Sequence, residues 1–154
     1  MKLAIFTLAE KEYGVDIKDI KEVIRMRKIT PVPDAAAYVE GVMSLRGRVV
    51  PLINLRKKLG LEKKDMMLLN RIIVTDIKGK SVGVIVDGVT DVMTVGSESV
   101  TPPDEVLKGA GYLTGVARIG KRLILLVDIG KLLAGDAAKS IEKVHSRVEV
   151  RRKD

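Results

Sequence analysis

The 154-residue sequence contains no cysteine, no tryptophan and a single histidine, His145. The absence of cysteine excludes disulfides, thiolate nucleophiles and cysteine-ligated metal sites. Any histidine-based triad or metal site would have to rest on His145 alone. No stretch approaches the ~18 apolar residues of a membrane span, and the opening MKLAIF is too short for a signal peptide. We therefore expect a cytoplasmic protein without direct membrane insertion.

Basic residues dominate the charge balance. There are 28 Lys+Arg and 20 Asp+Glu, a net charge of +8, while 46% of the residues are hydrophobic, enough for a core. A basic surface favours acidic partners. Single-stranded nucleic acid is usually held by aromatic side chains as well as charge, but the chain has only one phenylalanine and three tyrosines. We therefore interpret the basic residues as a solvated surface and expect no nucleic-acid partner.

The chain contains two copies of one unit. Two pairs of segments align without gaps and in the same order: residues 38–59 with 112–133, at an offset of 74, and residues 13–24 with 82–93, at an offset of 69. The matches include Gly41 with Gly115 and Arg48 with Arg122. The sequence therefore predicts two equivalent structural units, with about five residues of net insertion in a connecting loop.

Each copy is predicted to consist of strands. Valine and isoleucine together outnumber leucine, which favours strands over helices. Hairpins are expected over residues 3–17 and 72–87, with further strands at residues 21–26, 39–45, 48–54, 90–95, 113–119 and 122–128. Five strands in about 70 residues match a small closed barrel. We therefore expect an all-β fold of two packed five-stranded barrels related by the internal repeat.

Short helices are expected to close each copy. Asn54 and Asp128 can cap helices that end at Gly60 and Gly135. The sequence thus predicts one domain over residues 1–135, with approximate halves 1–68 and 69–135. The basic tail, residues 136–154, has three apolar residues at helical spacing: Ile141, Val144 and Val148. We expect this tail to form a marginal helix that frays.

No active site is indicated by the sequence. No glycine-rich segment ends in Gly-Lys-Ser/Thr before a helix, and the acidic residues lie where turns and caps explain them. His145 is expected to be a solvated histidine of the tail. We therefore expect no enzymatic activity, no cofactor and no metal.

Arg46 is the residue that the repeated fold does not explain. The second copy has Gly120 at the equivalent position, and Asp91 stands in place of Glu22 with no arginine expected opposite it. An arginine beside a tight turn suits pairing with a carboxylate. We therefore expect Arg46 to meet Glu22 at an exposed groove rather than in a core, as a pair peculiar to the first copy.

Residues 41–55, GVMSLRGRVVPLINL, resemble a motif of the CheW family of bacterial chemotaxis. Residues 6–23, 82–93 and 112–133 are similar to other parts of that family, so the resemblance covers residues 3–135 in order. It implies two SH3-like five-stranded barrels. It also implies a non-enzymatic adaptor, monomeric when isolated, that couples the cytoplasmic tip of methyl-accepting chemotaxis receptors to the regulatory domain of the histidine kinase CheA.

The resemblance also implies two binding surfaces. The receptor-binding residues that it carries over are Ile20, Glu22, Val23, Gly41, Arg46, Gly47 and Val92. The apolar members would contact a receptor helix, and Gly41 would allow its close approach. The kinase-binding residues that it carries over are Ile29, Thr30, Pro31, Val32, Pro33, Glu105 and Val106. Valine stands at 106, where family members often carry an aromatic residue.

Three other functions stay open at this point. The same module could belong to a kinase regulatory region or a receiver-bearing adaptor, although 154 residues leave no room for such a domain. A small basic β-barrel could bind RNA, and a steep salt dependence of affinity would reveal it. An enzyme is disfavoured by the missing residue sets.

Overall fold

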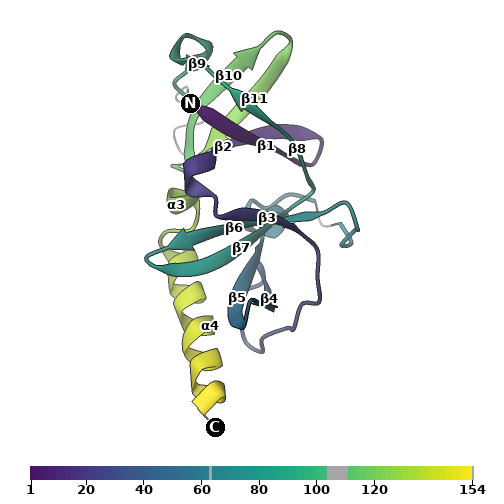
Figure 1. Ribbon diagram of the computed structural model, residues 1–154, viewed down its shortest axis with the longest axis vertical. Coiled ribbons are helices and arrows are strands. Elements are labelled where there is room, and N and C mark those ends of the chain that lie inside the picture. The colour runs from purple at the N-terminus through teal and green to yellow at the C-terminus, as the bar shows by residue number, and fades with distance from the viewer. Residues whose placement is uncertain (63, 104–110, 154) are drawn as a thin grey trace.

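The computed structural model describes residues 1–62, 64–103 and 111–153. Its strands form two sheets, one above the other in Figure 1, with the orders β8-β1-β2-β11-β10-β9 and β3-β6-β7-β5-β4. The strands are β1 (Lys2–Leu8), β2 (Lys11–Asp16), β3 (Glu22–Arg25), β4 (Val39–Leu45), β5 (Arg48–Asn54), β6 (Arg71–Ile77), β7 (Lys80–Val86), β8 (Gly88–Thr94), β9 (Val100–Thr101), β10 (Leu113–Ile119) and β11 (Arg122–Val127). The predicted all-β class is confirmed.

Helices are few and mostly short. They are the 3-10 turns η1 (Ile17–Asp19) and η2 (Ser97–Ser99), and the α-helices α1 (Leu55–Lys58), α3 (Ile129–Leu132) and α4 (Asp136–Lys153). The predicted caps are present, since Asn54 accepts from the Lys57 amide at 3.2 Å and Asp128 from the Lys131 amide at 3.0 Å. Within the described ranges, no helix is both long enough and apolar enough to cross a membrane.

The upper sheet has six strands rather than the expected five. The additional strand is β9, whose Thr101 pairs with Val116 of β10. In the lower sheet the equivalent place holds an isolated bridge between Thr30 and Val42. The difference between the sheets is therefore one extra pair of residues rather than a different architecture.

Residues related by the two offsets occupy the same register. Gly41 pairs with Leu52 beside a bulge in β4, and Gly115 pairs with Leu126 beside a bulge in β10. The parallel ladders also correspond, because Leu52 lies opposite Gly83 and Leu126 lies opposite Gly14. Each copy therefore supplies the same set of strands, in the same pairing.

The two copies exchange their hairpins. The β1–β2 hairpin of the first copy lies in the sheet with β8, β10 and β11, and the β6–β7 hairpin of the second copy lies with β3, β4 and β5. Each sheet is thus assembled from both halves of the chain. The boundary near residue 68 does not separate the two sheets.

One short connection explains this exchange. β7 ends at Val86, opposite Arg71, and β8 begins only two residues later at Gly88, opposite Thr7. If β8 paired with the hairpin of its own copy, Gly88 would lie opposite Asp76, five residues along β6 from Arg71 and roughly 16 Å away. Two Cα–Cα steps span less than about 8 Å. The chain therefore has to continue into the other sheet.

The tail helix packs on the core, contrary to the expectation of a marginal helix. Ala137, Ile141 and Val144 of α4 are buried, at 0%, 3% and 2% exposure, in the apolar cluster that also contains residues of both sheets. The Tyr38 hydroxyl lies 3.2 Å from the Ser140 hydroxyl. Figure 1 shows α4 running along the lower sheet. Burial of one helix face gives this segment the tertiary support that its sequence pattern understates.

Candidate functional site

Arg46 and Glu22 meet at the surface, as predicted. Arg46 donates two hydrogen bonds to the Glu22 carboxylate, at 2.9 and 2.7 Å, and the two side chains are 72% and 25% exposed. These bonds hold the pKa of Glu22 below its usual range. Glu22 begins β3, one edge strand of the lower sheet, and Arg46 follows β4, the other edge strand. This pair therefore bridges the open seam between the two edges of the sheet.

The expectation that no arginine faces Asp91 is wrong. Arg122, the first residue of β11, reaches both Asp91 oxygens at 3.5 Å and hydrogen-bonds to Glu12. The pKa of Asp91 is lowered by its hydrogen bond from Thr90 and then by Arg122. An arginine thus bridges the seam of each sheet, but from different positions in the repeat. Because a long side chain can reach the seam from either position, matching positions did not reveal the second pair.

The turn at Arg46 has a conformation that suits glycine. Arg46 has φ +50° and Gly47 has φ +77°, while Gly120, the counterpart of Arg46, has φ +58°. Left-handed backbone is unfavourable for residues with a side chain. The turn itself therefore does not explain the arginine at this position.

The other predicted receptor-binding residues differ in exposure. Val23 on β3 is 40% exposed and Val92 on β8 is 62% exposed, and they lie in different sheets. Ile20 is half-buried against the core. Gly41 is buried with φ +149°, and a Cβ there would lie 2.2 Å from the Thr30 carbonyl oxygen. The absence of a side chain at Gly41 thus permits a close contact with Thr30 within this chain.

Only part of the predicted kinase-binding segment is exposed. Ile29 and Val32 are half-buried against the apolar clusters, whereas Thr30, Pro31 and Pro33 are exposed. Arg147 of α4 donates to the Pro33 carbonyl, so the tail helix borders this segment. Glu105 and Val106 lie outside the described residues.

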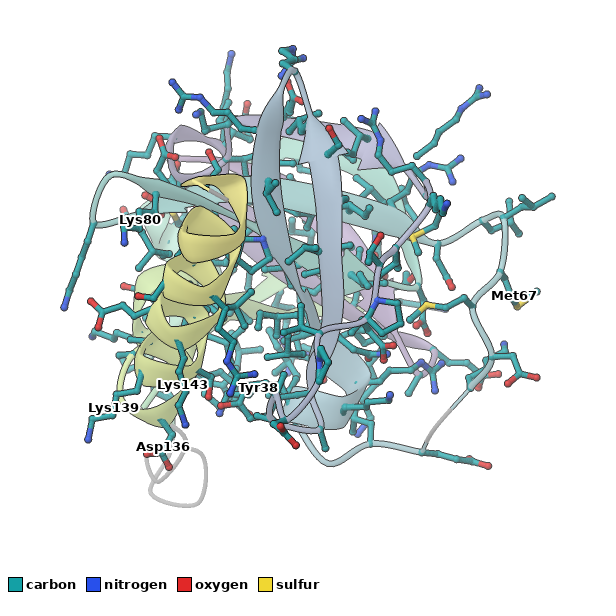
Figure 2. All side chains as sticks on the ribbon, turned by 90° about the horizontal axis from the view of Figure 1, so that it is seen from below. Tyr38, Met67, Lys80, Asp136, Lys139 and Lys143 are labelled. Carbon is teal, nitrogen blue, oxygen red and sulfur yellow. The ribbon has the colours of Figure 1, made fainter. Side chains whose placement is uncertain are left out.

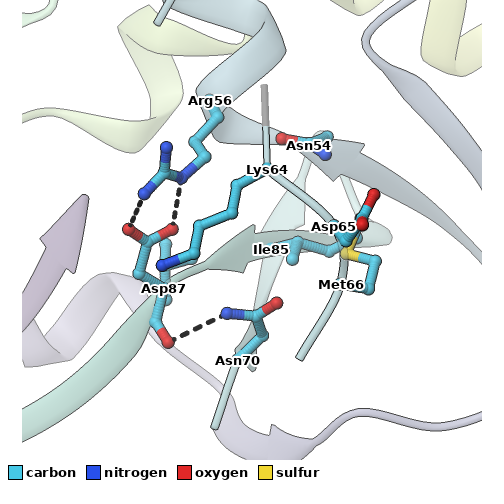
Figure 3. Close-up of a pocket in the computed structure, with 9 residues that line it drawn as sticks. Asn54, Arg56, Lys64, Asp65, Met66, Asn70, Ile85 and Asp87 are labelled. Carbon is cyan, nitrogen blue, oxygen red and sulfur yellow. Dashed lines mark hydrogen bonds and ion pairs between the residues drawn. The ribbon is translucent and has the colours of Figure 1, made fainter. Parts of the chain in front are cut away.

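A paired arginine and aspartate were missed by sequence reasoning. Arg56 of α1 donates to both oxygens of Asp87, which follows β7, at 2.7 and 2.5 Å (Figure 3). The Ala9 amide donates to the same carboxylate at 2.9 Å, and the two side chains are only 12% and 24% exposed. The pair links the lower sheet to the β1–β2 turn of the upper sheet. Its signal in the sequence was that the second copy has Gly130 where the first has Arg56.

Arg56→Ala is expected to lower the free energy of unfolding by ~1–3 kcal/mol, because it leaves the Asp87 carboxylate without its main partner. Chemical denaturation measures this loss. Lys21→Ala, which removes an exposed pair with Asp76 at 3.4 Å, is the control and should change stability little. Equal effects of the two substitutions would contradict a buried role for Arg56.

The same pair predicts a pH dependence. Burial alone would raise the pKa of Asp87, but hydrogen bonds from Arg56 and the Ala9 amide outweigh it and the pKa is lowered. A carboxylate with a lowered pKa stabilises the fold above its unfolded pKa of about 3.9, and this contribution is lost as pH falls through the folded value. The stability gap between the wild type and Arg56→Ala should therefore narrow below about pH 4.

No metal centre is indicated in the part of the chain that the structure describes, because no three metal-ligating side chains come together there. His145 lies on α4 and is half-buried rather than solvated, contrary to expectation.

Comparisons with known proteins agree with the fold. The family described as the CheW-like domain matches residues 2–137. Chemotaxis protein CheW of Treponema pallidum is 33% identical over 149 residues, covering 93% of this chain and 86% of that protein. Chemotaxis protein CheW of Klebsiella aerogenes is 35% identical over 142 residues, covering 91% of this chain and 86% of that protein.

A solved structure is similar as well. The scaffolding protein TtCheW from Thermoanaerobacter tengcongensis superposes with a TM-score of 0.80 and 33% identity, covering 88% of this chain and 89% of that chain. The two SH3-like barrels and the family match over residues 2–137 point to the same conclusion. This chain belongs to the CheW-like domain family of chemotaxis proteins.

Proposed function

We propose that this chain is a non-enzymatic, cytoplasmic adaptor that couples methyl-accepting chemotaxis receptors to the histidine kinase CheA. Membership of a chemotaxis scaffold family supports the proposal. The observation that carries it is the exposed Glu22–Arg46 pair beside Val23. The Arg46 guanidinium of the β4–β5 turn is fixed at Glu22, the first residue of β3, and Val23, the next residue of that strand, adds an exposed apolar side chain. This combination suits an amphipathic receptor helix.

The kinase is proposed to bind a separate surface at the exposed residues Thr30, Pro31 and Pro33. These residues follow β3 and precede β4, so the two partners would contact neighbouring parts of the same barrel. Co-precipitation of the purified chain with a CheA regulatory domain and with a receptor cytoplasmic fragment tests both contacts. Binding of neither partner, or transfer of phosphate from CheA to this chain, would contradict the adaptor proposal.

Arg46→Gly is expected to weaken receptor binding while leaving the melting temperature unchanged or raised. The substitution removes an exposed ion pair, which contributes little to folding, and places glycine in a left-handed turn that favours it. Thermal melts and receptor titrations measure the two effects. Arg48→Ala, which removes a neighbouring exposed arginine, is the matched control and should bind normally. A large fall in melting temperature would instead assign the pair to the fold.

A further inference from the structure

The loop between α1 and β6 exposes four consecutive large apolar side chains. Met66, Met67, Leu68 and Leu69 are 40%, 45%, 92% and 70% exposed, and we name residues 66–69 the apolar tip. Figure 2 shows Met67 on a loop that projects away from the body, on the side opposite α4. The other exposed large apolar residues among those described are isolated in sequence: Met1, Ile17, Val23, Val92 and Leu123. A contiguous exposed apolar patch marks an interaction site.

Hydrogen bonds fix the backbone of the apolar tip. The Asn70 side chain accepts from the Met67 amide at 2.7 Å, and the Asn70 amide donates to the Met67 carbonyl at 3.0 Å. The Arg71 guanidinium donates to the Leu68 carbonyl at 2.8 Å. Leu68 and Leu69 are thus the central residues of a closed turn. Binding of a partner to Leu68 and Leu69 therefore costs little backbone entropy, because the turn is already ordered.

The ends of the loop are held by the Arg56–Asp87 pair. Arg56 donates to the Glu62 carbonyl at 2.9 Å, and the Asn70 side chain donates to the Asp87 carbonyl at 3.1 Å, a contact drawn in Figure 3. Loops whose ends are brought together in this way are frequently functional. The half-buried pair therefore serves as the base from which the apolar tip projects.

The apolar tip adjoins β3 through Arg71. Arg71, which holds the tip, pairs with Arg25 of β3, and Val23 and Arg25 are the two exposed residues of that strand. Two arginines therefore lie between the tip and Val23. The adjacent Lys64 and Asp65 offset each other in charge. The whole strip is apolar at both ends and basic between them.

We propose that the apolar tip is a second contact for the receptor helix, which extends the surface of Glu22, Val23 and Arg46. The inference rests on the proposed function. The strip fits an amphipathic α-helix that presents apolar side chains at two places along its length and carboxylates between them. The leucines of the tip and Val23 contact the apolar side chains, and Arg25 and Arg71 face the carboxylates.

The test compares Leu68→Ser/Leu69→Ser with the wild type in titrations against a purified receptor cytoplasmic fragment. The double substitution should raise the Kd by about tenfold or more, while kinase binding and the melting temperature stay unchanged. Leu123→Ser, at a 53% exposed leucine of β11, is the matched control and should bind as the wild type does. Leu68→Ser alone provides a second variant at the most exposed position and should show a smaller loss of affinity.

Several outcomes would overturn this assignment. Unchanged receptor affinity in the double variant, together with loss of affinity in Arg46→Gly, would refute the tip contact and leave the proposed function standing. Absence of receptor binding by the wild type would contradict both. A wild-type dimer that the double substitution dissociates would assign the tip to a second copy of the chain. Binding to phosphatidylserine vesicles that the substitution abolishes would assign it to a lipid surface.

Discussion

Gly41→Ala is expected to lower the free energy of unfolding by ~2–5 kcal/mol. A Cβ at this position would lie 2.2 Å from the Thr30 carbonyl oxygen, closer than atoms approach, so the two segments must separate. Separation breaks the paired bonds between Thr30 and Val42, each 2.8 Å long. The φ of +149° adds a backbone cost for alanine. Urea denaturation at neutral pH measures the change.

Two glycines serve as matched controls for this prediction. Gly79 has φ +80°, and nothing lies within 4 Å of the place that a Cβ would take, so Gly79→Ala reports the backbone cost alone. Gly115, the counterpart of Gly41, has its Cβ position 3.0 Å from the Thr101 carbonyl oxygen and no left-handed φ, so Gly115→Ala should destabilise the protein less than Gly41→Ala. Wild-type stability of Gly41→Ala with lost receptor binding would contradict this prediction and support the receptor contact that the family resemblance implies.

Ile141→Ala should destabilise the protein by about 2–5 kcal/mol, the usual cost of truncating a buried isoleucine. Ile141 is 3% exposed on α4 and belongs to the cluster that contains Phe6, Ile53 and Val144. The truncation leaves a cavity between the helix and the barrel. The midpoint of chemical denaturation and the loss of far-UV helical signal should shift together, because the helix and the core unfold as one unit.

Lys143→Ala is the control on the same helix. Lys143 is exposed, and Figure 2 shows it directed away from the barrel beside Lys139. Alanine is at least as good a helix former as lysine, so this variant should keep wild-type stability. An Ile141→Ala protein with an unchanged midpoint would show that the tail frays in solution, as its sparse apolar pattern had indicated.

Local features of the fold were predictable from the sequence because they depend on neighbouring residues. The strands at residues 39–45, 48–54 and 113–119 agree residue for residue with β4, β5 and β10. The caps at Asn54 and Asp128 follow from side-chain oxygens next to exposed helix amides. Ala137, Ile141 and Val144 lie on one buried face of α4. The apolar pattern of this tail was too short to distinguish a packed helix from a marginal one.

The hairpin exchange was not predictable from the repeat. A hairpin could pair in the same register with the strands of its own copy or with those of the other copy. Alignment of the two copies at fixed offsets therefore fits both arrangements equally well. What decides between them is Asp87, the single residue between β7 and β8. A connection of one residue cannot carry the chain across the length of a strand. Loop length, rather than residue similarity, contained the missing information.

The candidate site was predicted where the two copies differ in charge. The second copy has Gly120 at the position equivalent to Arg46, and this difference predicted the pair of Arg46 with Glu22. The contact is confirmed. The second copy likewise has Gly130 at the position equivalent to Arg56. Arg56 stands in a run of basic residues, however, and such residues were interpreted together as a solvated surface. The Arg122–Asp91 contact shows the limit of this comparison, because equivalent contacts can come from non-equivalent positions.

The exchanged hairpins also bear on how an adaptor transmits geometry. The chain passes from the upper sheet to the lower after β2, returns after β7, and passes down again into α4. Within the described ranges, three crossings and the shared cluster join the two barrels, so the chain has no single hinge there about which one barrel could rotate. A protein bound to one barrel is therefore held in a fixed orientation relative to a protein bound to the other barrel. Alignment of bound proteins, rather than flexible tethering, is the mechanical behaviour that this connectivity favours.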